Sequence, residues 1–512
     1  MNMSKVSNLT AFWLTLSLPQ KALLVAFILL KIALIVLLPL TGDEAYFITW
    51  GQNLSLGYYD HPPAVGWVLY FLSLVGDDLF WYRSFAFFSA LLIAYLLYKL
   101  ITLNDLVEKT TAIWVALAFL VSPISLMFVV TANDTVLVLF AVLGVYFFAK
   151  AIHMQSWLDT LLAGLFLGLA FLSKYFAAFM LIGLLAYALW FWRNINLKQL
   201  MLMVLMVALA VAENLYFNAT HCWNNILFNF FSRTEESQFA LHNVAAYVGM
   251  ILLLLSPLGL WYLVQSKQHD LPAVSAFSNP KTLVLFAAIP LLVVLLLVSF
   301  TNTVGLHWPL ISVTLLYVLY SGLSQGQLKK LFVFNAVFSN GVAVILLVAL
   351  GFVNQLISPT QQHHVAVYTQ SEKVCEYLPE NTAFFTLGYS SQSALAYHCG
   401  NDNVHVFASV SKYGREDDKL TDFKALDGQS LTILITHEKE AAKISPYFQS
   451  MHVKPLKIDE QTTYYLIEGS GFNYALYRQQ ILTKVNDKFY TAPDWFPVIE
   501  NGCGFKRKYG FE

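Results

Sequence analysis

The sequence predicts a polytopic α-helical membrane protein that ends in a water-exposed domain of α/β or α+β type. Its 512 residues are 58% hydrophobic and only 12% charged. The mean hydropathy of +0.60 is well above that of water-soluble globular proteins. Apolar runs long enough to cross a bilayer recur up to residue 353, after which the apolar density drops. The net charge of -1 and the lack of a basic run argue against nucleic acid as a partner.

The run at 21–40 is the first expected span. About 20 residues suffice to cross a hydrocarbon core of roughly 30 Å, and no small-residue cleavage site follows this run. We therefore expect it to stay in the protein. Further apolar runs bring the expected total to roughly 11 spans. They lie at 84–103, 111–131, 134–152, 158–173, 175–192, 199–217, 244–264, 282–300, 309–323 and 331–353.

The basic residues predict an orientation in the membrane. With a cytoplasmic N-terminus, most of them fall in cytoplasmic connections, as the positive-inside rule requires. These residues are Lys99, Lys109, Lys150, Arg193, Lys198, Lys267, Lys281, Lys329 and Lys330. Near the membrane on the outer side only Arg83, Lys174 and Arg233 are left. An odd number of spans also delivers the C-terminal tail to that outer side.

The tail is expected to form a separate domain. Its short β-like runs, such as TAFFTLGY, LTILITH and TTYYLIEG, predict mixed α and β structure. All four cysteines fall on the outer side, where Cys375 and Cys399 are the first choice for a disulfide; four free or buried thiols are the alternative. The expected domains are a membrane domain at 1–353, with outer loops at 41–82 and 218–243, and a soluble domain at 354–512.

The first outer loop sets ionisable and aromatic side chains at the mouth of a span. They include Asp43, Glu44, Asp60, His61, Tyr46 and Tyr59. Carboxylates beside interfacial aromatics suit a polar substrate carried on a lipid. Asp43 and Glu44 are adjacent, so they point different ways, and one can act as a base while the other binds a hydroxyl or a cation. Taken alone, the pair is better explained as acids that complement a helix dipole at the membrane edge.

Five segments together resemble a known family. They are GDEAYFITWGQNLSLGYYDHPP at 42–63, TAND at 131–134, GLFLGLAFLSKYFA at 164–177, NATHCWNNILFNFFSR at 218–233 and HWP at 307–309. In this order they resemble the polytopic glycosyltransferases of the GT-C fold, and most closely the bacterial protein-mannosyltransferase-like group that includes lipid A aminoarabinose transferases. The resemblance covers nearly the whole membrane part, and the C-terminal domain follows the same plan.

The resemblance implies a transferase of the bacterial inner membrane whose C-terminal domain lies in the periplasm. Such an enzyme moves a sugar from a polyprenyl-phosphate donor to lipid A, another envelope glycan or a protein, and it works among membrane lipids. The catalytic carboxylate of the family maps to Asp43, with Glu44 as a supporting carboxylate. The chemistry agrees, because phosphate is a competent leaving group and one base suffices for an inverting displacement.

A leaving phosphate needs positive charge in a site where water is scarce. Lys174 lies between two apolar runs, and we expect a functional role for it because an unpaired ammonium there is costly. Arg83 and Arg233 are donor-phosphate candidates that also suit plain positioning roles. His61 is also a donor-phosphate candidate, because a protonated histidine can bind phosphate. It stands where the family often carries a lysine, which puts aminoarabinose specificity in doubt. Lys31, within the first span, is expected to be paired for structural reasons.

The remaining candidates have weaker signals. The resemblance implies one divalent ion, zinc or magnesium, between Asp60 and His221, and ordinary hydrogen bonding by an interfacial histidine is the alternative. Asp134 either faces the site or caps a span, while His307 and Trp308 either line the sugar pocket or belong to an aromatic belt. Tyr46 and Tyr59 are also expected to contact substrate.

Two other functions compete with an envelope glycosyltransferase. One is a protein O-glycosyltransferase of the same family. The other is a transporter or flippase for lipid-linked sugars, which should show internal repeats and polar residues at mid-membrane. The sequence has no convincing repeat, and apart from Lys31 its ionisable residues gather at the membrane faces. This distribution favours an interfacial enzyme.

Overall fold

The computed structural model describes residues 13–232, 238–266, 276–378, 383–460, 462–497, 499 and 503–511. The chain forms two compact units, each built from several stretches of sequence. The helical unit comprises Met1–Leu38, Asp78–Val211 and Ser237–Leu350. The mixed unit comprises Pro39–Asp77, Ala212–Glu236 and Gly351–Glu512. The predicted division at residue 353 stays a prediction.

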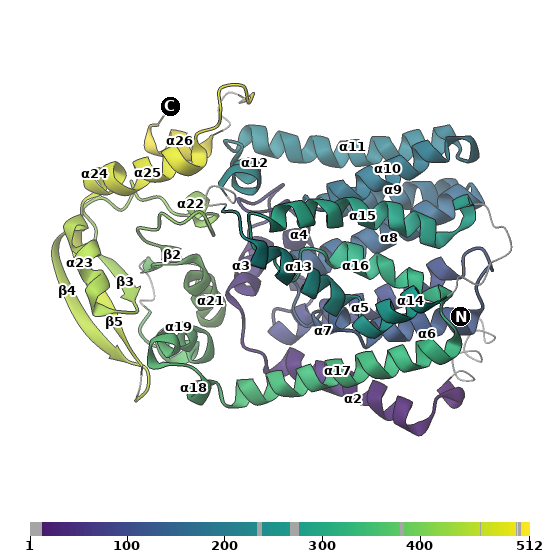
Figure 1. Ribbon diagram of the computed structural model, residues 1–512. Helices are drawn as coiled ribbons and strands as arrows, with labels where there is room; N and C mark the ends of the chain where they lie inside the picture. The colour runs from purple at the N-terminus through teal and green to yellow at the C-terminus, as the bar shows by residue number, and fades with distance from the viewer. Residues whose placement is uncertain are drawn as a thin grey trace. The chain divides into compact units, whose positions relative to one another are not determined.

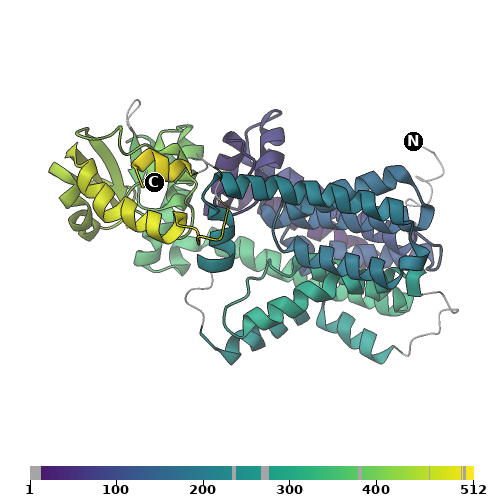
Figure 2. The same cartoon turned by 90° about the horizontal axis from the view of Figure 1, so that it is seen from above.

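The helical unit consists of long apolar helices, most of which run along a common direction (Figures 1 and 2). The apolar runs of the sequence become helices because a chain in hydrocarbon must satisfy its backbone groups internally. The helices that begin in this unit are α2 Leu18–Leu37, α5 Leu79–Ile101, α6 Lys109–Leu120, α7 Pro123–Leu126, α8 Asn133–Met154, α9 Trp157–Phe171, α10 Ala177–Trp190, α11 Leu197–Thr220, α13 Leu241–Leu254, α14 Pro257–Gln265, α15 Pro280–Ser299, α16 Leu310–Leu316 and α17 Gln325–Gly351.

The helices confirm a multi-pass membrane protein. Among the described residues, six helices are long and apolar enough to cross a membrane, and the pair α13 and α14, bent by 80°, makes a seventh if it counts as one span. Each of the predicted apolar runs coincides with a helix or a helix pair, but α6, α9, α10 and the segment Leu310–Gly322 are shorter than a full crossing. The total of roughly 11 spans therefore stays a prediction.

Two buried cations hold helices of the helical unit together. Lys31 on α2 donates through Nζ to the carbonyl of Ser125 at 2.6 Å and to its Oγ at 3.3 Å, which confirms the structural pairing predicted for it. Arg83 on α5 is fully buried, and its Nη1 donates to the carbonyls of Ile35 and Leu38 at 2.8 and 2.7 Å. Arg83 thus binds the last carbonyls of α2, which a helix leaves without intrahelical partners.

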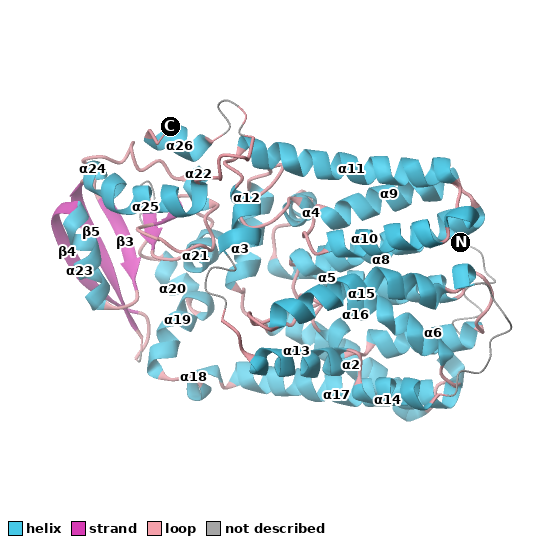
Figure 3. Ribbon diagram, turned by 45° about the horizontal axis from the view of Figure 1, so that its top comes forward, coloured by secondary structure: helices cyan, strands magenta, loops and turns pink. Residues whose placement is uncertain are grey.

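The mixed unit contains a five-stranded sheet, and among the described residues all strands belong to it (Figure 3). The strand order is β2-β1-β3-β5-β4. β1 pairs in parallel with β2 and β3, while β5 pairs antiparallel with β3 and β4. The three runs predicted as β-like contain β1, β3 and most of β5, which confirms the mixed domain. The strands are β1 Phe384–Thr386, β2 Val404–Val406, β3 Leu431–Ile435, β4 Phe448–Lys457 and β5 Thr463–Phe472.

Helices cover both faces of this sheet. Alternate residues of a strand point to opposite faces, so Phe384 joins one apolar cluster and Phe385 the other. On β3, Leu434 belongs to the first cluster and Ile433 to the second. The helices of the C-terminal stretch are α18 Val353–Leu356, α19 Pro359–Thr369, α20 Ser371–Cys375, α21 Tyr389–Cys399, α22 Asp417–Leu420, α23 Ala441–Ile444, α24 Tyr474–Tyr477, α25 Thr483–Val485 and α26 Gly504–Tyr509.

Two loops of the membrane part belong to the mixed unit. The first forms α3 Gly42–Gln52 and α4 Ala64–Ser73, and the second contains α12 Asn224–Leu227. Thr41 begins α3 with a capping box, in which Oγ1 accepts from the Glu44 backbone at 3.3 Å and the Glu44 side chain accepts from the Thr41 backbone at 3.5 Å. The acidic pair that opened the first loop therefore stands in the first turn of a capped helix.

Two disulfides lie in the mixed unit. Cys375 pairs with Cys399, as predicted, and this bond joins α20 to the end of α21. Cys222 pairs with Cys503, a bond that the sequence analysis did not predict because 281 residues separate the two cysteines. It ties the second loop to the segment that begins α26.

We expect loss of the Cys222–Cys503 disulfide to destabilise the mixed unit more than loss of the other. A longer closed loop restricts the unfolded chain more, and loops of 281 and 24 residues differ by at most about 2 kcal/mol. The helices inside the longer loop stay inserted in the membrane, which reduces this difference. Melting followed by protease sensitivity measures the loss of stability in the double variants Cys222→Ala/Cys503→Ala and Cys375→Ala/Cys399→Ala. A larger loss in the second double variant would contradict the expectation.

Candidate functional site

Four of the predicted residues come together in the helical unit. Lys174 lies in the break between α9 and α10, and Asp134 lies in the first turn of α8. The Lys174 Nζ donates to both carboxylate oxygens of Asp134, at 2.9 and 3.0 Å. The side chains are only 6% and 14% exposed, so this is a largely buried ion pair. Such a pair is stable only when both charges are present, because removing one leaves the other uncompensated.

His307 and Trp308 complete this group from the turn before α16. The Nε2 atom of His307 is 3.9 Å from the second oxygen of Asp134, and the imidazole is half exposed. The ring of Phe176 lies 5.2 Å from the Lys174 ammonium and 5.4 Å from the ring of Trp308. The site therefore combines a buried cation, an exposed imidazole and aromatic walls, which suits an anion attached to a sugar.

Asn133 is a further member of this group that the sequence analysis missed. It begins α8, one residue before Asp134, and it is 2% exposed. Neither its amide nitrogen nor its amide oxygen has a hydrogen-bond partner among the described residues. A buried amide without partners is costly, and the start of a 22-residue helix favours negative charge. The TAND segment was the only available signal, and it drew attention to its aspartate alone.

The helix start is fixed by its own polar residues. Thr131 donates through Oγ1 to the carbonyl of Tyr82 on α5 at 2.7 Å, and Thr135 donates to the carbonyl of Val130 at 2.9 Å. The Ala132 backbone N–H in turn donates to Thr135 Oγ1 at 3.4 Å. These contacts hold the first turn of α8 in place. Asn133 and Asp134 are the residues of this turn that remain as candidates for binding a ligand.

In the mixed unit, Asp43 has a partner from the C-terminal stretch. Asp43 is exposed in the first turn of α3, and its Oδ1 accepts a hydrogen bond from the hydroxyl of Tyr389 at 2.9 Å. Burial, and then the charge of Asp43, raise the pKa of Tyr389 above its ordinary value, so the phenol keeps its proton. An exposed carboxylate with one donor and free lone pairs can accept a proton from a bound hydroxyl.

Close packing places Tyr389 at this carboxylate. Gly42 lies so near α21 that an added Cβ would be 2.6 Å from the Cβ of Ser390. Gly414 has a φ of +68°, and an added Cβ would collide with the ring of Tyr389. A side chain at either glycine would push α21 and α3 apart or displace the tyrosine. The sequence gives no sign of this contact, because 346 residues separate Tyr389 from Asp43.

A tyrosine also links Asp60 to the C-terminal stretch. The hydroxyl of Tyr46 accepts from the backbone N–H of Glu416 at 3.1 Å and donates to the carboxylate of Asp60. Burial, followed by the charges of Asp60 and Glu416, raises the pKa of Tyr46. The backbone N–H of Tyr59 donates to the Glu416 carboxylate at 2.7 Å, and its ring is fully buried against Phe228. These contacts give Tyr46 and Tyr59 structural roles, and their predicted substrate contacts stay predictions.

The other phosphate candidates differ in what the structure says of them. Arg83 binds backbone carbonyls, which fits the positioning role that the sequence left open. His61 lies in a turn closed by a hydrogen bond from the Tyr58 N–H to the His61 carbonyl at 3.0 Å. Arg233 lies outside the described residues. Glu44 is buried and serves the capping box. The phosphate-binding and catalytic roles of these residues stay predictions.

The residues proposed for a metal do not by themselves make a zinc site. His221 lies just beyond α11, and its Nδ1 donates to the carbonyl of Phe217 at 2.9 Å. The carboxylate of Asp60 is bound by Tyr46. Among the described residues there is no group of three or more histidine, cysteine or acidic side chains that could hold an ion, whereas zinc sites use at least three such ligands. We therefore derive no chemical step through a metal, and the metal stays a prediction.

His221 predicts a pH dependence of stability. Burial, and then the charge of Lys419, lower the pKa of His221 from 6.5 to about 4. The unfolded chain therefore binds the proton more readily between these values, and the free energy of unfolding should fall as the pH drops from 6.5 towards 4. In His221→Asn this part of the pH dependence should flatten. Melting temperatures of the purified protein at several pH values measure it, and identical profiles would contradict the assignment.

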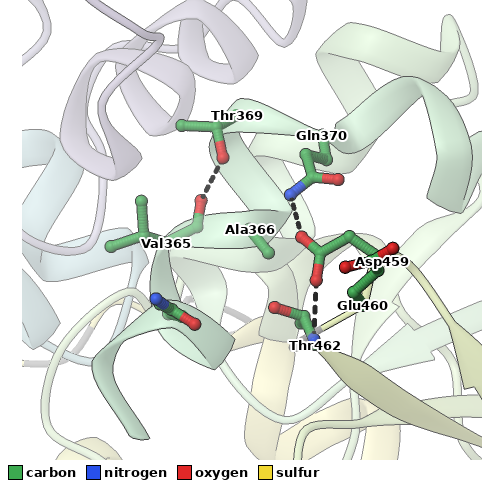
Figure 4. A pocket seen from close by; sticks show the side chains of 8 residues that line it. Val365, Ala366, Thr369, Gln370, Asp459, Glu460 and Thr462 are labelled. Atoms are coloured by element: carbon green, nitrogen blue, oxygen red, sulfur yellow. Dashed lines mark hydrogen bonds between the residues drawn. The ribbon is translucent and has the colours of Figure 1, made fainter. Parts of the chain in front are cut away.

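A cavity at one edge of the sheet is a poor candidate for chemistry. It measures about 240 Å³ and lies between α19 and the turn from β4 to β5 (Figure 4). The carboxylate of Asp459 lines this cavity. It accepts one hydrogen bond from the side-chain amide of Gln370 and another from the backbone N–H of Thr462. Asp459, Gln370 and the backbone of Thr462 thus bind one another.

Comparisons with known proteins agree with the resemblance. Residues 60–217 match the family model described as dolichyl-phosphate-mannose-protein mannosyltransferase. The lipid A galacturonosyltransferase RgtD of Rhizobium johnstonii is 29% identical over 183 residues, which is 35% of this chain and 38% of the relative. The match thus spans well under half the length of that curated relative.

Solved structures match over more of the chain. The structure of ArnT from Cupriavidus metallidurans in the apo state has a TM-score of 0.61 and 13% identity, and covers 87% of this chain and 97% of its own. The same protein bound to undecaprenyl phosphate has a TM-score of 0.60 and 12% identity, with the same coverage. The chain therefore has the GT-C fold of ArnT, as its sequence predicts, and its residues 60–217 are similar to the mannosyltransferase family model.

Proposed function

We propose that this chain is an inner-membrane glycosyltransferase that moves a sugar from a polyprenyl-phosphate donor to lipid A or another envelope glycan on the periplasmic side. The observation that carries the proposal is the buried Lys174–Asp134 pair at the start of α8, beside the amide of Asn133, which has no hydrogen-bond partner in the described part of the chain. The name of RgtD and the lipid phosphate bound to ArnT support a lipid A acceptor and a polyprenyl-phosphate donor.

Lys174 is the group that we assign to the donor phosphate. In the structure its charge is balanced by Asp134, at 2.9 Å. A phosphate oxygen would take a share of the ammonium hydrogens, and the half-exposed His307 and the Asn133 amide add further donors. The N-terminus of α8 also favours binding of the donor phosphate, because the backbone N–H groups at a helix start attract anions. As the sugar leaves, the growing phosphate charge is stabilised where water is scarce.

Asp43 is the base that we assign to the acceptor hydroxyl. The acceptor oxygen forms a bond to the anomeric carbon while the bond from that carbon to the phosphate oxygen breaks. The hydroxyl proton passes to the Asp43 carboxylate, and polyprenyl phosphate leaves with the electron pair. One attack from the opposite face inverts the anomeric centre. The hydrogen bond from Tyr389 to Oδ1 fixes the carboxylate and leaves its other oxygen for the proton.

Mass analysis of the cell envelope tests this function. Lipid A and surface glycans are compared between cells that carry the wild-type gene, no gene, or Asp43→Asn. We expect one glycan or lipid A species to lose the mass of a single sugar in both deficient strains. An unchanged set of masses, although the variant is inserted in normal amounts, would refute transfer to the envelope. A mass change confined to proteins would instead indicate the protein-directed member of the family.

A further inference from the structure

A second cavity of the mixed unit has the chemistry of an anion site. It measures about 380 Å³ and is lined by the end of α11, the start of α12, α22 and α26. All of its lining residues belong to the mixed unit. The Cys222–Cys503 disulfide fixes the second loop beside α26, so the walls of the cavity are joined covalently. Neither the first-loop carboxylates nor Lys174 line it.

Cations predominate on its walls. Lys419, Arg507 and Lys508 line the cavity. Arg507 is exposed, and its guanidinium pairs with no residue of the described chain. Lys508 is held in place because its Nζ donates to the carbonyls of Asp418, Lys419 and Thr421, at 3.2, 3.0 and 2.9 Å. The three donors of Lys508 are thus used within the protein, and this ammonium offers a ligand only its charge, whereas the guanidinium of Arg507 can donate charge-assisted hydrogen bonds to a phosphate.

The acids near the cavity are already engaged. Asp418, which also lines it, accepts two hydrogen bonds of 2.7 Å from the guanidinium of Arg415 and one of 2.8 Å from the hydroxyl of Tyr490. Glu416 pairs with Lys419 at 2.6 Å. Lys419 is therefore only partly available to a ligand, and Arg507 is the lining cation that no side chain or carbonyl of the described residues engages.

A neutral acceptor and an aromatic wall accompany these cations. Asn224 lines the cavity and is 1% exposed, yet its Oδ1 has no hydrogen-bond partner among the described residues. The rings of Tyr490 and Phe505 stack at 4.2 Å and form an apolar side of the cavity. A buried carbonyl oxygen without a donor calls for a hydroxyl or amine on the ligand. Phosphate, hydroxyl groups and an apolar ring face are the features of a phosphorylated sugar.

We propose that this cavity binds the phosphate-bearing sugar of the glycolipid acceptor, with Arg507 on the phosphate and Asn224 on a sugar hydroxyl or amine. The inference rests on the proposed function, because it assigns the acceptor of that transferase. The same chemistry is offered by a soluble sugar phosphate, so the experiment separates the two sources. The C-terminal helix α26 gains a role in acceptor recognition.

Binding to the purified full-length chain in nanodiscs tests the site. The probes are inorganic phosphate, glucosamine, glucosamine 1-phosphate and vesicle-delivered lipid A bearing phosphates. Arg507→Gln should lower the affinity for lipid A and for glucosamine 1-phosphate roughly tenfold, which corresponds to the loss of one charge-assisted contact. Lys506→Gln, with the same loss of charge on the same helix but outside the cavity lining, should bind as wild type.

Asn224→Ala separates a sugar site from a plain anion site. This variant should bind glucosamine 1-phosphate and lipid A more weakly and should bind inorganic phosphate as wild type does. Its melting temperature shows whether the variant protein is folded. Tight binding of lipid A but not of the soluble sugar phosphate identifies the lipid as the ligand, and the reverse identifies a free sugar phosphate. Equal binding by wild type and Arg507→Gln, or no binding of any phosphate probe, would overturn the site.

The same preparations separate this inference from the proposed function. Asp43→Asn should bind inorganic phosphate and glucosamine 1-phosphate as wild type does, because Asp43 does not line the cavity. If sugar transfer depends on Asp43 while Arg507→Gln leaves acceptor binding unchanged, the site is wrong and the function stands. If the probes bind as expected but Asp43→Asn still transfers sugar at the wild-type rate, the function assigned to Asp43 is wrong and the site stands.

Discussion

Asp43→Asn is expected to lower the rate of sugar transfer by about 10² to 10⁴-fold, which is the usual contribution of a positioned general base. The amide keeps the shape of the side chain and can still accept from Tyr389, but it cannot take the acceptor proton. Because Asp43 is exposed and outside the capping box, the protein should fold normally. Initial rates with purified protein, together with melting temperatures, measure the two effects separately.

A matched control uses Asp402, an exposed aspartate in the turn before β2. Asp402→Asn removes the same charge from the same unit and should leave the transfer rate unchanged. Tyr389→Phe removes the donor to Asp43 and should give an intermediate rate. Equal activity of Asp43→Asn and Asp402→Asn would mean that the carboxylate has no chemical role.

Lys174→Met is expected to abolish transfer and to destabilise the helical unit. Breaking a buried ion pair leaves the Asp134 carboxylate uncompensated, which costs roughly 3–5 kcal/mol. Lys454→Met is the control: Lys454 forms an ion pair of similar length with Glu468, at 2.6 Å, but the two side chains are 51% and 46% exposed. We expect about 1 kcal/mol or less for that substitution. Thermal melting and initial rates report both consequences.

The double variant Lys174→Met/Asp134→Asn distinguishes stability from function. Removing both charges should restore much of the lost melting temperature, because no buried charge is left unpaired. Transfer should nevertheless stay abolished, since the phosphate has lost its cation. Recovery of activity together with stability would show that the pair serves only to hold α8 against the break between α9 and α10.

The membrane helices and the C-terminal sheet were predictable because they depend on local signals. Each predicted apolar run became a helix or a helix pair, and the β-like run LTILITH contains β3. The pairing of Cys375 with Cys399 was also within reach, since only 24 residues separate them. Short helices such as α6 and α9 show the limit of this signal, because an apolar run does not say where a helix breaks.

The partners of the candidate site were beyond sequence reasoning because each depends on a distant contact. Tyr389 reaches Asp43 across 346 residues, and Lys174 reaches Asp134 across 40. The sequence did single out Asp134, Lys174, His307 and Trp308, each with a plainer alternative. The structure brings these four residues together, and their functional roles stay predictions. Asn133 was missed, because an asparagine at a helix start is an ordinary residue until its amide is found buried without a partner.

Stoichiometric release of polyprenyl phosphate is the most direct test of glycosyl transfer. Purified protein is given a panel of radiolabelled polyprenyl-phosphate sugars, including a uronic acid and an amino sugar, together with phosphorylated lipid A. We predict that one donor yields glycosylated acceptor and an equal amount of free polyprenyl phosphate, and that Asp43→Asn and Lys174→Met yield neither. Donor consumption without labelled acceptor, or transfer that survives in both variants, would contradict the proposed chemistry.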